Sequence, residues 1–196
     1  MKPRTATIKR KTRETEITVT LNVDGSGTST LNTGLPFLDH MLELLSRHSL
    51  IDMKVSAKGD FEVDYHHTVE DIGLTLGEAL DKALGTRKGI GRYGWSYVPM
   101  DETLSRVVID LGGRPYLVKN MVCKQRKIRD FDLSLFTDFF QAFSVQGRMN
   151  LHIAQLLGRE GHHAYESVFK ALARALRMAC AQDPREKRIP SSKGSL

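Results

Sequence analysis

The sequence predicts an α+β fold with an internal duplication. Segments with strand-like alternation and segments with helical periodicity follow one another in the order hairpin, helix, strand, helix, and this order occurs twice. A His-His-x-x-Glu motif opens the last predicted helix of each half, at His66 and again at His162. No low-complexity linker separates the halves, so we expect residues 1–196 to form one domain, with halves of about 1–95 and 96–185.

In the first half, alternating residues around a glycine-rich turn predict a β-hairpin. Residues 17–23 and 28–31 alternate between apolar and polar side chains, with Asp24-Gly25-Ser26-Gly27 between them. The elements predicted after this hairpin are a helix over 37–45 that follows Pro36, a strand over 51–55, a short strand over 61–63, and a helix over 66–84 that Gly85 ends.

The second half repeats this order. The predicted elements are strands over 107–111 and 116–118 around Gly112-Gly113, a helix over 135–143, a strand over 150–154 and a helix over 162–180. In the last of these, apolar residues at Val168, Leu172 and Ala175 have the spacing of one buried helical face.

The composition indicates a globular protein with an anionic partner. The formal net charge of +6 and a sequence pI of about 9.4 favour nucleic acid, anionic lipid or a phosphorylated small molecule as the partner.

No apolar run approaches the roughly 20 residues of a membrane helix, and no apolar segment follows the basic residues 1–13, which argues against a secretory signal. Cys123 and Cys180 are too far apart for a CxxC motif, and we interpret them as reduced packing residues of a cytosolic protein.

The two His-His-x-x-Glu motifs predict a pair of metal ions. On an ideal helix, His67 lies about 100° from His66, and Glu70 lies between them at about 40°. The imidazoles therefore diverge, while the carboxylate can join the ligands of either metal. Imidazole and carboxylate together favour Mn²⁺ and do not exclude Zn²⁺, Fe²⁺ or Co²⁺. A single motif could be a solvated helix start, but its recurrence as His162-His163 with Glu166 favours the metal interpretation.

Other histidines and three basic loops have two interpretations each. His40 and His152 are either core histidines or ligands, and His48 is either structural or a neighbour of the site. Glycine and basic residues combine in three segments that either hold a phosphate or form solvated loops: 84–94, 112–115 and 190–194.

Nine segments form a more specific pattern, in the order 10–15, 37–42, 64–73, 89–94, 99–102, 113–115, 152–153, 162–166 and 190–194. With these segments, nearly the whole chain resembles the imidazoleglycerol-phosphate dehydratase family. The resemblance implies that each half forms a four-stranded sheet packed against helices, and that two Mn²⁺ ions occupy each active site. The metal ligands that it implies are His40, His66, His67, Glu70, His152, His162, His163 and Glu166.

The resemblance also implies how the substrate is bound and how the chain assembles. The implied substrate and phosphate contacts are Glu14, Arg92, Arg114, Ser191, Ser192 and Lys193, the last three within a substrate-binding tail over 186–196. Family members form a homo-oligomer of 24 subunits built from trimers, with active sites shared between subunits. The partners that we expect are therefore a phosphorylated small molecule and further copies of the chain, in the cytoplasm, without nucleic acid or membrane.

The implied reaction converts D-erythro-imidazole glycerol phosphate into imidazole acetol phosphate and water, a step of histidine biosynthesis. The carbon proton that is lost is not acidic, so simple acid–base removal would face a high barrier. A cation on the ring nitrogens favours the imidazolate, which can expel hydroxide to give a diazafulvene-like intermediate with an acidic C–H. We hypothesise that Glu14 is the base, with His48 and metal-bound water as competitors; Glu70 and Glu166 complete the predicted catalytic set.

Two other function classes remain as alternatives. A di-metal phosphohydrolase would also use two metals and basic loops, although such sites usually rely on aspartate ligands. An RNA-binding module would agree with the positive charge, but an aromatic content of 7% provides no stacking array and leaves the histidine motifs without a role.

Overall fold

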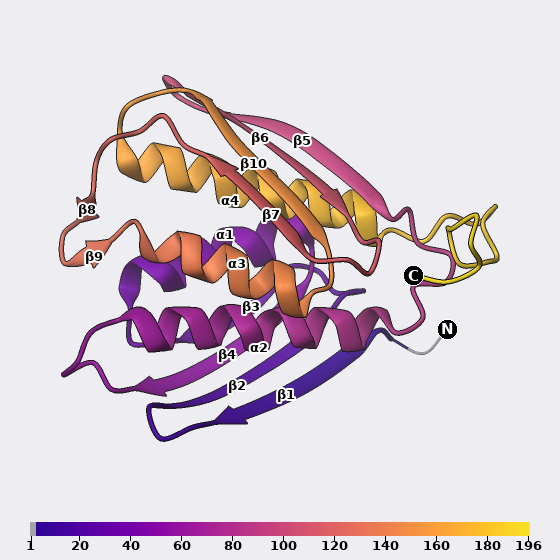
Figure 1. Cartoon of the computed structure of the whole chain (residues 1–196), viewed down its shortest axis with the longest axis horizontal. Helices are drawn as coiled ribbons and strands as arrows, with labels where there is room; N and C mark the ends of the chain where they lie inside the picture. Colours follow the sequence, from indigo (N-terminus) through magenta and orange to yellow (C-terminus); the bar gives the residue numbers. More distant parts are fainter. Residues whose placement is uncertain (1–2) are drawn as a thin grey trace.

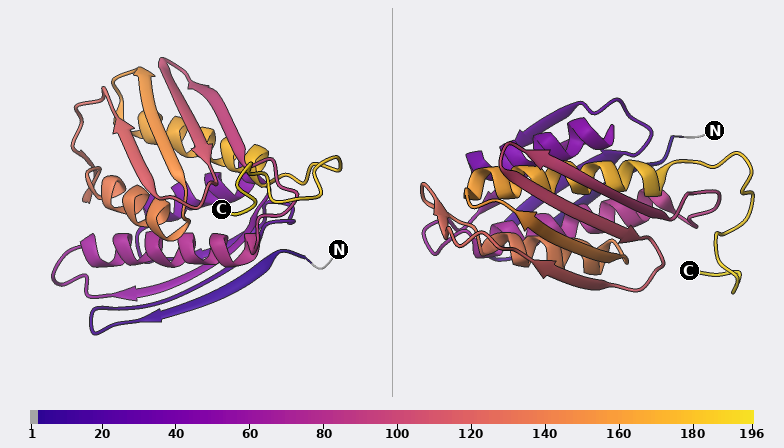
Figure 2. Two further views of the ribbon diagram at one scale, coloured as in Figure 1. Left: turned by 45° about the vertical axis from the view of Figure 1, so that its right-hand side comes forward. Right: turned by 90° about the horizontal axis from the view of Figure 1, so that it is seen from above.

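The structure is a computed structural model that describes residues 3–196. Two four-stranded sheets form the outer layers, and the helices lie between them (Figures 1 and 2). The elements are β1 (Thr5–Lys11), β2 (Thr15–Asn22), β3 (Ser29–Asn32), α1 (Pro36–Ser49), β4 (Asp52–Gly59), α2 (His66–Leu84), β5 (Tyr93–Met100), β6 (Thr103–Asp110), β7 (Tyr116–Asn120), β8 (Lys127–Ile128), β9 (Phe131–Asp132), α3 (Leu135–Gln146), β10 (Asn150–Leu157) and α4 (Gly161–Cys180). Within these residues, no helix combines the length and the apolar character needed to cross a membrane.

Both sheets have the same topology, which confirms the predicted α+β fold of two similar halves. The strand order is β1-β2-β4-β3 in the first sheet and β5-β6-β10-β7 in the second. In each half, an antiparallel hairpin is followed by a strand, a helix and a strand that inserts between the hairpin and the preceding strand. Alternation turns one face of each sheet inward, as in β2, where Ile17, Val19 and Leu21 are buried.

The hairpins predicted around the two glycine-rich segments are wrong. Residues 17–23 and 28–31 do not pair, because β4 lies between β2 and β3; in the same way, β10 lies between β6 and β7. The first glycine-rich turn is bound to β4 instead, since the Asp52 carboxylate accepts hydrogen bonds from the backbone N–H groups of Ser26 and Thr28. The hairpins that do form join β1 to β2 and β5 to β6.

The predicted strand over 61–63 is also wrong, whereas the helices agree closely with expectation. Residues 61–63 form a turn, in which the Val63 N–H donates to the Asp60 carbonyl at 2.8 Å. The sequence did not predict β5, whose first residues fall in the basic segment 84–94. α2 has the predicted bounds, and α1 and α3 continue a few residues beyond theirs.

Helices from opposite halves pack against each other and form the centre of the molecule. α2 lies along α3, and α1 lies along α4. Gly73 and Gly77 allow the backbone of α3 to approach α2, since a Cβ atom at either position would lie 2.6 Å from a carbonyl oxygen of Phe139 or Phe143. Buried phenylalanines of α3 then fill the space around this contact. The core therefore depends on both halves at once.

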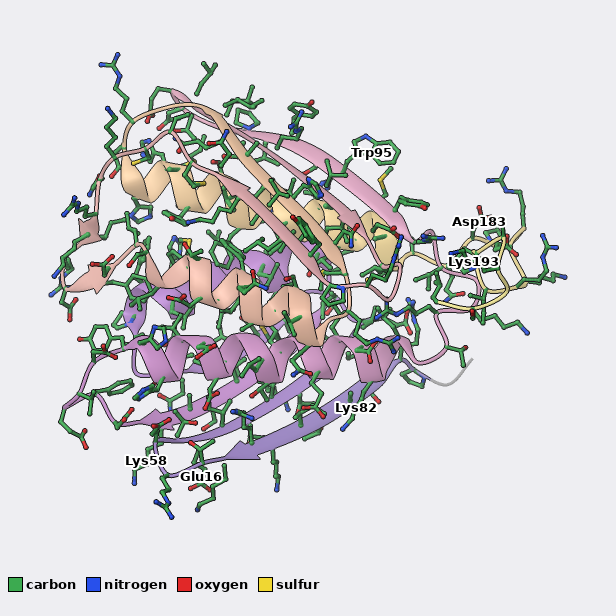
Figure 3. The ribbon with its side chains drawn as sticks, in the orientation of Figure 1. Glu16, Lys58, Lys82, Trp95, Asp183 and Lys193 are labelled. Atoms are coloured by element: carbon green, nitrogen blue, oxygen red, sulfur yellow. The ribbon has the colours of Figure 1, made fainter. Side chains whose placement is uncertain are left out.

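The molecule has two different ends along its long axis. α2 and α4 begin at the same end, on the left in Figure 1, which we call the histidine end. The linker 85–92 and the C-terminal tail lie at the opposite end, which we call the tail end and where Figure 3 labels Lys193. Predicted metal ligands and predicted phosphate ligands therefore lie mostly at opposite ends of one chain.

Candidate metal centre

Three metal-ligating side chains meet at the histidine end. His162 and Glu166 lie one turn apart on α4, and His40 extends from the neighbouring α1. The Nε2 atoms of His162 and His40 lie 3.2 Å and 3.4 Å from Oε2 of Glu166. One ligand atom from each residue lies within 4.8 Å of the other two, and residues 3–196 contain no other group of three with this property. The arrangement suits a single divalent ion.

Glu166 is ionised in this cluster, as a metal ligand must be. Its side chain is only 11% exposed, and burial alone would raise its pKa. The Lys170 ammonium group, 2.7 Å from Oε1, and the nearby His40 nevertheless hold the pKa of Glu166 below its usual range. Lys170 was not predicted as a site residue, although its position one helical turn after Glu166 was a usable signal.

The matching group in the first half is more open. Nε2 of His66 lies 3.7 Å from Oε2 of Glu70, and Nδ1 of His66 lies 3.4 Å from Oδ2 of Asp138. Asp138 comes from α3 just as His40 comes from α1, so the first histidine of each motif faces a helix of the other half. Asp138 was missed because nothing in the sequence indicated that α3 lies beside α2.

The second histidine of each motif is bound by a carboxylate from outside the motif. Nδ1 of His67 lies 3.0 Å from Oδ2 of Asp60, and Nδ1 of His163 lies 2.8 Å from Oε2 of Glu102. These hydrogen bonds raise the pKa of both histidines. The contact with His163 also lowers the pKa of Glu102 to about 2. Neither acid was predicted as a site residue, although Glu102 ends one of the family-like segments.

The two candidate bases lie in different places. Glu14 is in the turn between β1 and β2, with Oε1 3.9 Å from Nε2 of His67, and therefore belongs to the histidine end. His48 is in the last turn of α1, where burial and then the charges of Lys170 and Arg174 lower its pKa. A lowered pKa keeps the imidazole neutral near pH 7, which is the form that can accept a proton.

His152 does not reach either cluster within the chain. It is exposed on the outer face of the second sheet, where its neighbours across the strands are Val108 and Val118. The interpretation of His152 as a buried core histidine is therefore wrong. Its exposure leaves the interpretation as a ligand open.

The predicted phosphate ligands gather at the tail end. Arg92 makes two hydrogen bonds to the Asp110 carboxylate and donates a third to the carbonyl of Pro190, so it ties the tail to β6. The Asp110 contact raises the pKa of Arg92 further. Arg114 lies in the loop before β7, and its carbonyl accepts a hydrogen bond from Asn150. Ser191, Ser192 and Lys193 lie in the tail, where Ser191, Ser192 and neighbouring tail residues line a shallow cavity.

The distance between the two ends can be estimated along α4. The Arg92 N–H donates to the carbonyl of Ala179, whereas His162 lies at the start of this helix. At 1.5 Å per residue, the two points are separated by roughly 25 Å. A small phosphorylated substrate cannot reach from one to the other.

Fold and site together define a class of protein: duplicated α+β chains in which matched histidine and glutamate side chains at two helix starts can hold metal ions. Comparison with known proteins identifies the family. A family model described as imidazoleglycerol-phosphate dehydratase matches residues 33–176. The chain belongs to the imidazoleglycerol-phosphate dehydratase family, as the sequence resemblance predicted.

Relatives and solved structures of this family match almost the whole chain. It is 56% identical to the imidazoleglycerol-phosphate dehydratase of Chromobacterium violaceum over 98% of both chains, and 56% identical to that of Hahella chejuensis over the full length of both. The crystal structure of the dehydratase from Staphylococcus aureus has a TM-score of 0.83 and 37% identity, and covers 91% of this chain and 99% of its own. The structure of the Pyrococcus furiosus enzyme in complex with (S)-C348 has a TM-score of 0.84 and 34% identity, and covers 96% of this chain and 100% of its own.

Family membership assigns the activity. The chain is a dehydratase, a lyase of histidine biosynthesis, and the phosphohydrolase and RNA-binding alternatives are not favoured.

Proposed function

We propose that this protein dehydrates imidazole glycerol phosphate at a site that holds two Mn²⁺ ions. The observation that carries the metal is the cluster of His40, His162 and Glu166, whose ligand atoms lie within 4.8 Å of one another. His66 and Glu70 repeat part of this arrangement in the first half. The donor set of imidazole and carboxylate suits Mn²⁺, with Zn²⁺, Fe²⁺ and Co²⁺ as competitors.

When bound, the metal supplies Lewis acidity that draws electron density from the imidazole ring of the substrate. The protein's own residues then have two tasks. The histidine and glutamate side chains would hold the metal ions, and the Glu14 carboxylate would accept the carbon proton of the substrate. The position of Glu14 beside His67 and its 52% exposure support this role, since the carboxylate is accessible to a ligand at the histidine end.

The role of Glu14 can be tested separately from metal binding. Glu14→Gln keeps the size of the side chain but removes its ability to accept a proton. We expect normal metal content and loss of turnover by at least about a hundredfold, the lower range of general base catalysis. Normal turnover in this variant would exclude Glu14 as the base and leave His48 and metal-bound water as the candidates.

We further propose that the active site forms between copies of the chain. The metal ligands lie at the histidine end, whereas Arg114, Ser192 and Lys193 lie at the tail end, roughly 25 Å away by the length of α4. The tail end of one copy must therefore approach the histidine end of another to bring phosphate ligands and metals together. On this basis we expect that replacing Lys193 with Ala raises KM strongly, and an unchanged KM would remove Lys193 from the site.

The outer face of the second sheet supports an assembly of this kind. Trp95, Val108, His152 and Val118 form one row across its four strands, and all four are exposed in the single chain. An exposed apolar row of this kind is typical of a protein interface. His152 in the middle of it would reach the metals of another copy, in a shell that we propose to contain 24 subunits built from trimers.

Metal analysis together with particle mass and product analysis tests the whole proposal. We expect two divalent ions per chain, a very large particle, and imidazole acetol phosphate as product with no release of inorganic phosphate. Full activity of the metal-free protein would overturn the proposed metal chemistry, and phosphate release would favour a phosphohydrolase. Both cysteines are free thiols, which supports the proposed cytoplasmic location.

A further inference from the structure

We infer that Asp60 and Glu102 are positioning residues that orient His67 and His163 for metal binding through Nε2. This inference rests on the proposed metal site. Neither acid lies in a His-His-x-x-Glu motif, and they come from different places in the fold: Asp60 follows β4, and Glu102 lies in the turn between β5 and β6. Each nevertheless makes the same contact with the second histidine of one motif.

The contact determines which ring nitrogen is available. Nδ1 of His67 lies 3.0 Å from Asp60, and Nδ1 of His163 lies 2.8 Å from Glu102. A neutral imidazole carries one proton, and a carboxylate at Nδ1 keeps that proton on Nδ1. Nε2 then has a free lone pair, and the ring cannot rotate away without breaking the hydrogen bond. Metal-bound histidines in proteins commonly have this arrangement, because it fixes the tautomer and increases the basicity of the ligand nitrogen.

The contacts of the Asp60 side chain do not indicate a role in stabilising the fold. Its side chain is only 17% exposed, and Oδ1 is buried without any hydrogen-bond partner among the described residues. An unsatisfied buried acceptor destabilises the folded state, so fold stability alone does not explain a carboxylate here. The contact between Oδ2 and His67 is the interaction that explains a carboxylate at this position.

Glu102 is held in place by its own set of contacts. Oε1 accepts a hydrogen bond from the Thr103 hydroxyl at 3.0 Å, and the backbone N–H of Glu160 lies 3.4 Å from the same atom. Thr103 is buried, so packing holds the hydroxyl that contacts Oε1. The carboxylate is therefore oriented by contacts that do not involve His163, and an oriented hydrogen-bond acceptor positions the imidazole.

The experiment measures Mn²⁺ affinity by electron paramagnetic resonance, in which free Mn²⁺ gives a strong signal that binding removes. Full-length wild type is compared with Asp60→Ala, Asp60→Asn, Glu102→Ala and Glu102→Gln. We expect each alanine variant to bind Mn²⁺ about 10- to 100-fold more weakly, the usual effect of removing such a partner. The amide oxygens of Asn and Gln can still accept a hydrogen bond from Nδ1–H, so these variants should recover most of the lost affinity.

Glu78→Gln is the matched control, because Lys82 is the only ion-pair partner of Glu78 within residues 3–196 and both lie on the more exposed face of α2. It removes the same charge and should leave Mn²⁺ affinity unchanged. Thermal unfolding of the metal-free variants separates positioning from folding, and we expect no variant to unfold markedly earlier than wild type.

Each outcome decides one question. Alanine variants with wild-type affinity would overturn the positioning role. Weak binding that Asn and Gln do not restore, together with earlier unfolding of the metal-free protein, would also overturn it, because the two acids would then be structural. Absence of Mn²⁺ binding in wild type is a separate result, which would overturn the proposed metal site itself.

Discussion

The two halves of the chain share one topology but present different outer faces. The outer face of the first sheet carries polar and charged side chains such as Glu16, Thr18 and Lys58, whereas that of the second sheet carries Trp95 and Tyr97. Figure 3 labels Glu16 and Lys58 on the first sheet and Trp95 on the second. Trp95 and Tyr97 are more than half exposed, at 55% and 56%. Since the inner faces of both sheets are apolar, the fold does not require this difference. In the assembly that we propose, the second sheet would face another copy of the chain and the first sheet would face water.

The largest effect is expected from a charge placed on the outer face of the second sheet. Trp95→Asp places a charge in the proposed interface, at the end of the exposed row that lies on β5, and we expect the assembly to dissociate into much smaller particles with loss of activity. Burying an unpaired carboxylate and losing an aromatic contact together cost on the order of several kcal/mol per interface. Light scattering after size-exclusion chromatography measures the particle mass.

The matching change on the first sheet is the control. Thr18→Asp puts the same charge on the partly exposed outer face of β2, and we expect the particle mass to stay that of wild type. A Trp95→Asp variant that keeps the wild-type mass would show that this face is not an interface. Dissociation of the Thr18→Asp variant would show that both faces take part.

The comparison of halves also shows which parts of the fold a sequence can predict. Helices were predicted well, because helical periodicity and the motif at His66 are local signals. Strand order was not, because β2 pairs with β4 through contacts such as Thr15 with Gly59, far apart in the sequence. The same error occurred in both halves: a glycine-rich segment suggested a hairpin, although a later strand inserts there.

In the candidate site too, contacts within one helix could be predicted from the sequence, whereas contacts between elements could not. Spacing along one helix predicted that His162 and Glu166 share a face. In the structure, Nε2 of His162 lies 3.2 Å from Oε2 of Glu166. Spacing could not join His40 to them, since that requires α1 to pack beside α4; only the family resemblance suggested it. Helical spacing gives no signal for Asp60 or Glu102, because neither acid lies on the helix of the histidine that it contacts.

The helix contacts between the halves offer a second, smaller test. Gly73 on α2 and Phe169 on α4 lie at the same position relative to the His-His-x-x-Glu motif of their half. Of the two, only Gly73 lets the backbone of another helix, α3, come close. In an exposed helix, Gly→Ala stabilises by about 1 kcal/mol. Gly73→Ala should instead destabilise by about 1–3 kcal/mol, because the new Cβ would lie 2.6 Å from the Phe139 carbonyl oxygen and α3 must shift.

Chemical denaturation of the metal-free protein measures this change. Glu78→Ala on the exposed face of the same helix is a suitable control, and its effect should stay within about 0.5 kcal/mol. If Gly73→Ala proves as stable as wild type or more so, the close approach of α2 and α3 is not required for the fold.

The smallest effect concerns the first residue of the inserted strand in each half. Asp52 begins β4 and Asn150 begins β10, and both hold the loop that leads into the neighbouring parallel strand. Asp52 accepts hydrogen bonds from residues of the glycine-rich turn, whereas the Asn150 amide donates to the Arg114 carbonyl. Only the carboxylate can be titrated, so this contact should depend on pH in the first half alone.

The direction of that dependence follows from the pKa of Asp52. Backbone hydrogen bonds, led by that of Thr28, lower its pKa to about 2 in the folded chain. A lowered pKa means that the contact stabilises the fold at a pH above about 4, the pKa of Asp in the unfolded chain, and is lost as the pH falls through about 2.

Asp52→Asn should therefore destabilise by about 1–2 kcal/mol near pH 6, since hydrogen bonds to a charged group are stronger than those to an amide. The difference from wild type should shrink towards pH 2, whereas Asn150→Ala should cost a similar amount at every pH. If the effect of Asp52→Asn is the same at pH 6 and pH 2, the turn is not held by the charge of Asp52.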